Sequence, residues 1–375
     1  MQTKLSLKNL KMMLEAEQNG ELIVNFEVLG TILIAVLVFW GLVCIHEFGH
    51  YIFARIFGVT IEEFSIGMGP KLVWYTSKRS NITYSLRSMP IGGYVAMVGE
   101  EGESSDPNSF DKKPSWQRLI ITVAGAAVNI TAGFIAMAIL TSMIYLYGTE
   151  VRDFYTPEET KSEISSKDSG LMVGDKIIKV NGKKVDIYDE LSYEIMRNGN
   201  KPVDLTIIRD GEVMELLDVV FPIDKASGQE FGVLDIKPLA VDRKLGNIIK
   251  FSWEKSILIV RMCWESIIDL IRGRYTVEAV SGPIGVSSAI GEAAKAGPLN
   301  LLYLVAMISI NLGVMNLLPI PALDGGRIIF ILIEMIGRRR LPRKVEDTIN
   351  MVGIIALIGL SVIILIKDFV TLILQ

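Results

Sequence analysis

The stretch that decides the fold runs from Thr31 to His50 and reads TILIAVLVFWGLVCIHEFGH. Its first part contains no charged residue, and it ends in the pattern H-E-x-x-H, formed by His46, Glu47 and His50. About 20 apolar residues make a helix of roughly 30 Å, which is enough to cross the hydrocarbon core of a bilayer. We therefore predict a transmembrane helix over residues 29–57 that carries two histidines and a glutamate near its end.

The composition of the whole chain agrees with a membrane protein. Half of the 375 residues are hydrophobic and the mean hydropathy is +0.41, which is too apolar for an ordinary soluble protein. The formal net charge is −4 and there is no long basic run, so we expect no nucleic acid partner. The two cysteines, Cys44 and Cys263, form neither a disulfide framework nor a zinc-finger spacing.

Three further segments are apolar enough to span a bilayer. The segment 299–336 is interrupted by NLLPIPALDGGR, and prolines and glycines at membrane depth indicate a broken helix that lines a buried cavity. The patterns predict an α-helical polytopic membrane protein with about four transmembrane helices. The predicted segments are an N-terminal tail (1–28), the first transmembrane helix (29–57), a cytoplasmic loop with strand-like stretches (58–115), the second transmembrane helix (116–148), an inserted α+β domain (149–245), an amphipathic helix with a connector (246–298), the broken third transmembrane helix (299–336), a basic cytoplasmic loop (337–351) and the fourth transmembrane helix (352–375).

The inserted domain reads as short strands joined by tight turns. The stretches DKIIKVNG (175–182) and VDLTIIRDG (203–211) end in N-G and D-G, which favour β-hairpins, and FGVLDIKP (231–238) indicates a further strand. A domain of about 90 residues is large enough for a core of its own.

Basic residues indicate the orientation in the membrane. They crowd the short loop before the fourth span, at Arg338, Arg339, Arg340, Arg343 and Lys344. We therefore expect this loop to be cytoplasmic. Counting spans backwards places the inserted domain outside, residues 58–115 inside and both termini outside.

The H-E-x-x-H pattern is typical of a zinc site. His46 and His50 are four residues apart, so they share a helix face and both imidazoles can reach one ion. They are the only two histidines in the chain. Glu47 would take a proton from metal-bound water, whose pKa zinc lowers to about 7. A chance match or a purely structural cluster is the alternative interpretation.

Catalytic zinc usually takes a third protein ligand. Cys44 lies two residues before His46, which turns it about 160° away from the ligand face of a helix. A carboxylate from elsewhere is the better candidate, and Asp324 is the only acidic residue between Leu299 and Ile333. Its isolation at membrane depth favours a ligand, and the alternative is an aspartate that caps a helix at a glycine-rich turn.

The chain resembles the site-2 proteases, which are M50-type intramembrane zinc metalloproteases, and in particular the bacterial regulator of sigma-factor protease branch. The resemblance covers nearly the whole chain from Thr31 onward. The family's metal motif matches residues 46–50, and its N-x-x-P-x-P-x-x-D-G matches Asn316, Pro319, Pro321, Asp324 and Gly325. The resemblance implies one Zn²⁺ per chain, Asp324 as the third zinc ligand and Asn316 as a residue that holds the substrate backbone.

Shorter matches lie on both sides of the second span. Gly67 and Gly69, within FSIGMGP, resemble the family's G-x-G segment, and residues 90–95 (PIGGYV) resemble its membrane re-entrant β-loop. Residues 281–285 (SGPIG) resemble another family segment.

The second span and the insert carry further matches. Ala124, Gly125 and Asn129 fit the family pattern, but Ala126 stands where the family usually has proline. The insert looks like a single PDZ domain, with residues 169–171 (SGL) and 174–175 (GD) at its familiar turn.

The resemblance implies an intramembrane zinc endopeptidase that cleaves transmembrane segments of membrane-anchored substrates, such as anti-sigma factors or signal peptide remnants, in regulated intramembrane proteolysis. The expected partners are single-span membrane proteins, peptide tails at the PDZ-like domain and the lipid bilayer. The expected location is the bacterial cell membrane, with the active site towards the cytoplasmic side. The expected site residues are Glu47 for catalysis, His46, His50 and Asp324 for the metal, and Asn316, Gly67, Gly69, Pro319 and Pro321 for substrate binding. The alternative is a membrane transporter or PDZ scaffold with a structural metal site.

Overall fold

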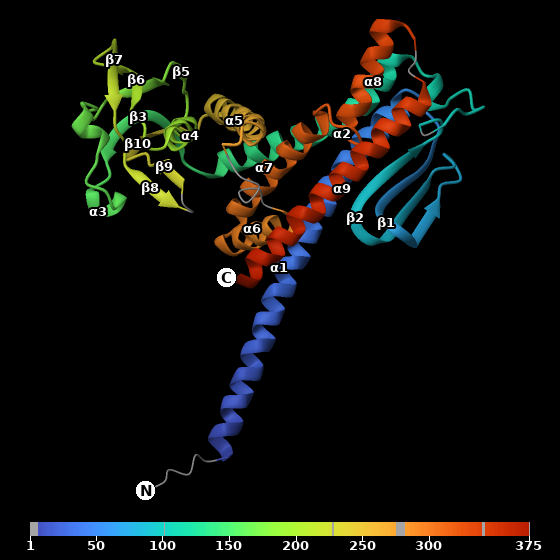
Figure 1. The fold of residues 1–375 in the computed structure, drawn as a ribbon, viewed down its shortest axis with the longest axis horizontal. Helices are drawn as coiled ribbons and strands as arrows, with labels where there is room; N and C mark the ends of the chain where they lie inside the picture. Colours follow the sequence, from blue (N-terminus) through green and yellow to red (C-terminus); the bar gives the residue numbers. More distant parts are fainter. Residues whose placement is uncertain (1–6, 101, 227–228, 275–281, 340–341, 375) are drawn as a thin grey trace. The chain divides into compact units, whose positions relative to one another are not determined.

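The computed structural model describes residues 7–100, 102–226, 229–274, 282–339 and 342–374 (Figure 1). The chain divides into two compact units. The first consists of residues 1–133 and 263–375, and the second of residues 134–262.

Four helices in the described part of the chain are long and apolar enough to cross a membrane. They are Leu29–Ile56, Ser115–Met143, Pro298–Leu317 and Lys344–Val370. Together with the mixture of helices and strands, they confirm the prediction of a polytopic α-helical membrane protein that also contains sheet.

The first unit is mainly helical. Its helices are α1 (Leu7–Ile56), most of α2 (Ser115–Met143), the end of α5 (Leu245–Ile271), α6 (Pro283–Ala296), α7 (Pro298–Leu317), α8 (Asp324–Gly337) and α9 (Arg343–Leu374). Small residues bring α2 and α7 together: a Cβ at Gly313 of α7 would lie 2.7 Å from the carbonyl oxygen of Ala126, and one at Gly133 of α2 would lie 2.9 Å from that of Ala306. Such close approach is how helices in a membrane gain packing energy.

Several boundaries differ from the sequence prediction. Residues 7–28 continue α1 instead of forming a separate tail, because strong helix formers without proline extend through them; residues 1–6 lie outside the described chain. The second span ends at Met143, since Leu146 already pairs with Val241 in a sheet. The last helix begins at Arg343, inside the predicted loop 337–351. In the segment 281–285, which resembles a family segment, residue 281 lies outside the described chain and Pro283 begins α6.

A β-hairpin that bends back on itself follows α1. It consists of β1 (Ile61–Thr76) and β2 (Thr83–Met97), with the short 3₁₀ helix η1 (Phe110–Lys112) after it. Residues 61–66 pair with 93–97 on one side, and 63–66 pair with 83–86 on the other, while 71–76 pair with 83–87. The chain bends at Gly67 and Gly69, whose φ angles of +87° and +85° lie in the region that favours glycine. An apolar core ties the hairpin to α1 and α2, through Ala54, Val59, Ile61, Ile82, Val95, Phe110 and Ile121.

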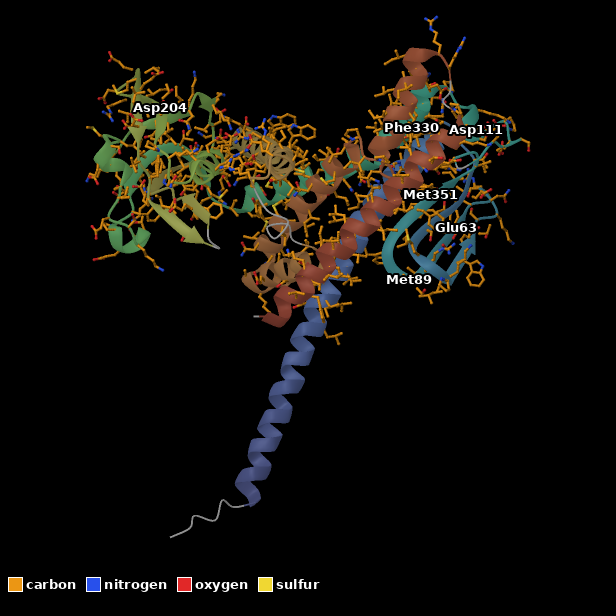
Figure 2. All side chains as sticks on the ribbon, in the orientation of Figure 1. Glu63, Met89, Asp111, Asp204, Phe330 and Met351 are labelled. Carbon is orange, nitrogen blue, oxygen red and sulfur yellow. The ribbon has the colours of Figure 1, made fainter. Side chains whose placement is uncertain are left out.

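Glu63 lies on the bent hairpin (Figure 2) and links its strands through three side chains. Its carboxylate accepts hydrogen bonds from Ser85 Oγ at 2.5 Å and Arg87 Nη2 at 2.9 Å, and pairs with Lys71 Nζ at 3.0 Å. Burial raises the pKa of Glu63, but the hydrogen bonds from Ser85, Lys71 and Arg87 outweigh burial and lower this pKa to about 2.

The second unit contains a six-stranded antiparallel sheet in the order β10-β3-β4-β6-β7, with β5 beside β4. Its elements are β3 (Leu146–Phe154), α3 (Pro157–Thr160), η2 (Ser166–Ser169), β4 (Lys176–Val180), β5 (Lys183–Lys184), α4 (Tyr188–Asn198), β6 (Val203–Arg209), β7 (Glu212–Val219), β8 (Ile223–Ala226), β9 (Gln229–Gly232) and β10 (Ile236–Val241). The turns Asn181-Gly182 and Asp210-Gly211 have positive φ throughout and join antiparallel strands, which confirms the two predicted hairpins. The predicted strand 231–238 divides between β9 and β10.

The second unit has a core of its own under one face of this sheet. Alternate residues of β6, Val203, Leu205 and Ile207, are buried, and they pack with Leu191 and Ile195 of α4. Strict alternation of buried and outward side chains fixes the register of β6, because a slip by one residue would expose this whole row.

Replacing Ile207 by alanine should destabilise the protein by about 2–5 kcal/mol, since Ile207 is fully buried and its loss leaves a cavity. Val213 on the neighbouring β7 is 65% exposed, so Val213→Ala is a matched control that we expect to change little. Thermal unfolding of the purified chain in detergent measures both. Equal effects of the two substitutions would contradict the assigned register.

The lowered pKa of Glu63 predicts that the stability of the fold depends on pH. Its pKa is about 2 in the folded chain against an ordinary value of 4.5, so the ionised carboxylate stabilises the fold above about pH 4.5, and this contribution is lost as pH falls towards 2. Glu63→Gln should therefore melt at a lower temperature at neutral pH and lose less stability than the wild type over that range. Melting curves at a series of pH values test this, and parallel curves for the two proteins would contradict it.

Candidate metal centre

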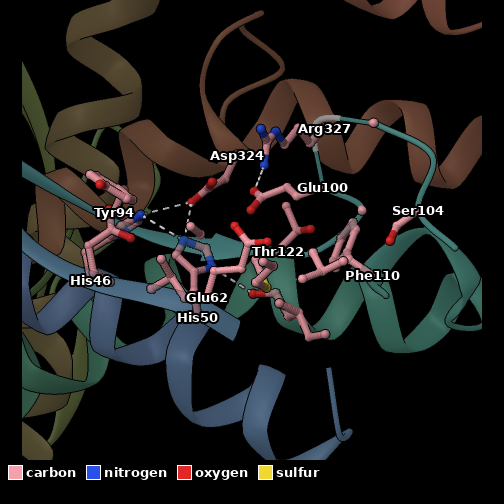
Figure 3. A pocket seen from close by; sticks show the side chains of 18 of the residues that line it. His46, His50, Glu62, Tyr94, Glu100, Ser104, Phe110, Thr122, Asp324 and Arg327 are labelled. Carbon is pink, nitrogen blue, oxygen red and sulfur yellow. Dashed lines mark hydrogen bonds and ion pairs between the residues drawn. The ribbon is translucent and has the colours of Figure 1, made fainter. Parts of the chain in front are cut away.

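Two histidines of α1 and one aspartate of α8 meet at a point (Figure 3). His46 Nε2 lies 3.0 Å from Asp324 Oδ2, and His50 Nε2 lies 3.3 Å from the same oxygen. The two Nε2 atoms are 3.2 Å apart, with the ring planes at 81°. The structure thus brings together the three side chains that the sequence suggests as metal ligands, although Asp324 follows His50 by 274 positions along the chain.

The spacing of these three atoms fits a tetrahedral zinc ion. Ligand atoms about 2.0–2.2 Å from such an ion lie roughly 3.3 Å from one another. The observed separations of 3.0, 3.2 and 3.3 Å match this value. Asp324 Oδ2 is buried, and the groups within ion-pair distance of it in the described chain are the two imidazole nitrogens, which are ligand atoms themselves, as expected for an oxygen that shares a cation with them. Two imidazoles and one carboxylate are also a donor set that catalytic zinc uses.

The two imidazoles fit because α1 and α2 touch backbone to backbone. A Cβ at Gly49 would lie 2.5 Å from the carbonyl oxygen of Ala124 and 2.9 Å from Cα of Gly125. A Cβ at Gly125 would overlap Nε2 of His50 and lie 2.8 Å from Nε2 of His46. Glycine is therefore required at both positions by close approach.

Helix α2 also orients the histidine rings. His50 Nδ1 donates a hydrogen bond to the carbonyl oxygen of Ile121 at 2.8 Å, which leaves the lone pair on Nε2 for a metal. Asn129 lies against the other ring, with its Nδ2 atom 3.4 Å from His46 Nδ1.

Asp324 owes its position to the break between α7 and α8. The first helix ends at Leu317, and Asp324 is the first residue of the second. Ala322 in between has φ +73°, and its backbone N–H donates to Asn350 Oδ1 of α9 at 3.3 Å. A Cβ at Gly325 would overlap the carbonyl oxygen of Leu318, so the glycine that follows Asp324 lets the chain fold tightly back.

A cavity of about 690 Å³ opens beside the three side chains. Glu47 lines it together with residues 94–97 of β2, so the cavity has a carboxylate and a strand edge next to the candidate ligands. Arg327 of α8 forms an ion pair with Glu100 at the same cavity (Figure 3).

The expected substrate-binding residues do not line this cavity within the described chain. They are Asn316, Gly67, Gly69, Pro319 and Pro321. Gly67 and Gly69 form the bend of the hairpin, and Pro321 lines a separate apolar cavity of about 450 Å³ beside α9. Their role in substrate binding stays a prediction.

Sequence reasoning missed Arg327, Glu100 and Tyr94 as residues of the cavity. For Arg327 the available signal is its place one helical turn after Asp324, which puts both on one face of α8. Tyr94 belongs to the segment 90–95 that the family resemblance singles out, but nothing in the sequence pattern indicates Glu100, because only the bent hairpin brings it to α8.

Residues 34–360 match the model of peptidase family M50. The chain belongs to this family. A protein of Clostridium acetobutylicum is 33% identical over 342 residues, which cover 90% of this chain and 97% of that protein, and one of Clostridium perfringens is 34% identical over 347 residues, covering 90% and 98%. A protein of Fusobacterium nucleatum is 31% identical over 338 residues, covering 90% and 98%. All three bear the name "Putative zinc metalloprotease". The M50 chain is a zinc metalloprotease, with Zn²⁺ as its cofactor.

The contact between α1 and α2 predicts how this M50 protease responds to an added methyl group. Gly125→Ala should lower the zinc content of the purified protein at least several-fold, since the new Cβ overlaps His50 Nε2. Gly41→Ala on α1 is the control, because a Cβ there meets nothing within 4 Å. Metal analysis after purification measures both. Full zinc occupancy in the Gly125 variant would mean that the helices are not in contact at this point.

Proposed function

We propose that this chain is an intramembrane endopeptidase in which His46, His50 and Asp324 bind the zinc and Glu47 acts as general base. The observation that carries the proposal is the convergence of three ligand atoms, 3.0–3.3 Å apart, beside a cavity that Glu47 also lines. The histidines belong to a helix long and apolar enough to cross a bilayer. Placing an ionisable group inside a membrane costs free energy, so ionisable residues found there typically have a function.

Glu47 carries the proton transfers of the proposed reaction. Bound zinc supplies Lewis acidity, which polarises the scissile carbonyl and makes water a stronger acid. The Glu47 carboxylate takes a proton from the attacking water and returns it to the leaving amine. A purely structural zinc site has no need of this carboxylate, which argues against a transporter or a scaffold.

The edge of the hairpin supports a way of presenting substrate. A substrate helix hides its peptide bonds in i to i−4 hydrogen bonds, so cleavage needs a locally extended chain. Residues 93–97 pair with 61–66 on one side, and no strand of the described chain pairs with their other side. Residues 94–97 also line the cavity, so an unwound substrate segment could add to this edge as a further strand.

The remaining substrate contacts belong to the same proposal. Asn316 would hydrogen-bond the freed substrate backbone, with Gly67, Gly69, Pro319 and Pro321 shaping the approach. The hairpin would re-enter the membrane from the cytoplasmic side, where the active site would lie.

The second unit would be a single PDZ-like domain outside the membrane. Its antiparallel sheet with α4 and its own core supports this proposal. It would bind peptide tails or exclude bulky ones, so that substrates already shortened outside reach the cavity. The substrates would be single-span membrane proteins of the bacterial cell membrane, such as anti-sigma factors or signal peptide remnants, cleaved in regulated intramembrane proteolysis.

Two substitutions separate catalysis from metal binding. Glu47→Gln should lower cleavage of a model single-span substrate in detergent by at least about 10²-fold, the loss expected for a general base, while zinc stays bound. Asp324→Ala should lose both zinc and activity. Glu292→Gln, an exposed glutamate of α6, serves as the control. Metal analysis and a gel-based cleavage assay on the same samples give both quantities.

The outcomes distinguish the proposed functions. A Glu47→Gln protein that still cleaves would refute the assigned general base. A wild type that holds zinc but cleaves no membrane substrate would favour the scaffold or transporter instead.

A further inference from the structure

The side chain of Asn129 is in an unusual position on α2. It is fully buried, its Nδ2 atom lies 3.4 Å from His46 Nδ1, and its Oδ1 atom has no hydrogen-bond partner within the described chain. A buried amide oxygen without a partner costs free energy, so it points to a hydrogen bond that this orientation of the amide does not make.

The two histidines differ in what faces their second nitrogen. A carbonyl oxygen can only accept, so Ile121 fixes a proton on Nδ1 of His50 and leaves Nε2 as the metal-binding nitrogen. At His46 the amide N–H of Asn129 faces Nδ1 instead. An N–H can only donate, so this arrangement places the imidazole proton on Nε2, the atom that faces Asp324, where it would block metal binding.

A half-turn of the Asn129 amide reverses this arrangement. The oxygen and the NH₂ group exchange places in nearly the same volume. Oδ1 then accepts a hydrogen bond from Nδ1–H of His46, the Nε2 lone pair is free, and the unpartnered oxygen gains its partner.

We propose that Asn129 is the positioning residue for His46: in the zinc-bound protein its Oδ1 accepts from His46 Nδ1–H and holds Nε2 towards the metal. The inference rests on the proposed role of His46 as a zinc ligand. Asn129 then does for His46 what the Ile121 carbonyl does for His50. Partners of this kind typically contribute a factor of about 10 to 100 to metal affinity.

The packing around Asn129 holds this residue in a fixed position, as a hydrogen-bond acceptor for His46 requires. Its own carbonyl oxygen accepts from Ser309 Oγ of α7 at 2.8 Å, and Ser309 is itself buried, so the residue is anchored between two helices. Ile121, Gly125 and Asn129 are spaced by four residues, so they lie on one face of α2, with the glycine opposite both imidazoles and an acceptor on either side of it.

Two variants separate an acceptor from a donor or a space-filler. Asn129→Leu keeps the number and branching of the side-chain heavy atoms and removes the acceptor, and we expect zinc to bind about 10- to 100-fold more weakly, measured by competition with a chelator. Asn129→Asp keeps the acceptor and removes the donor, so its affinity should stay within a few-fold of the wild type or rise. Thr141→Val is the control for loss of a buried polar group elsewhere on α2, and its affinity should not change.

The chain offers a direct readout, because it contains only two histidines. In zinc-loaded protein labelled with ¹⁵N-histidine and carrying no added histidines, both Nδ1–H groups should give slowly exchanging signals. In Asn129→Leu, the His46 signal should disappear or exchange faster with water, whereas the His50 signal should still exchange slowly.

Three results would overturn the proposal: wild-type affinity in Asn129→Leu, equal loss in the Asp and Leu variants while both remain folded, or two protected Nδ1–H signals in Asn129→Leu. None of these measurements needs proteolysis. A wild type that binds zinc and cleaves nothing would refute the proposed function alone, and zinc binding unchanged in Asp324→Ala would refute the metal centre itself.

Discussion

The backbone contact between α1 and α2 is the constraint on which the metal centre depends. At Gly49 and Gly125 the two helices approach so closely that a methyl group on either would collide with main chain or with an imidazole. In a bilayer, where lipid is as apolar as any side chain, helices gain from van der Waals contact and hydrogen bonds, and such contact requires small residues. The same contact places both imidazoles over the surface of α2, where a carbonyl group can orient His50.

The break between α7 and α8 completes the centre. A continuous helix would satisfy its own backbone and could present a carboxylate only from its side. The interruption instead lets Asp324 begin a new helix and face the histidines of α1. The positive φ of Ala322 and the missing side chain of Gly325 allow the backbone to turn tightly at this point. The buried oxygen of Asp324 and the two ring nitrogens form a polar cluster whose desolvation is offset when a cation binds.

The hairpin gives the centre its surroundings. Its bend, held by Glu63 and its three partners, directs residues 94–97 to the cavity beside Glu47. The ion pair between Arg327 and Glu100 links α8 to the loop that follows the hairpin. Metal ligands therefore come from helices, whereas part of the cavity wall beside them comes from a strand edge and the loop that follows it.

The sequence by itself determined the parts whose signal is local. Four apolar segments are identified by the length of helix that a bilayer requires. The turns Asn181-Gly182 and Asp210-Gly211 are identified by residue types that tolerate positive φ. The helical repeat places His46 and His50 on one face of a helix. The isolated carboxylate of Asp324 was identifiable because an ionisable group at membrane depth is costly.

Only the tertiary structure decided which distant residues meet. That Asp324 lies 3.0 Å from His46 depends on how α8 folds back, and the sequence pattern alone left a helix cap open as an alternative. The partners of the imidazoles on α2 and the place of Glu100 at the cavity likewise had no local signal of their own. Periodicity reports which face of an element is apolar, whereas the contact between two faces is set by packing across the whole unit, to which every element contributes.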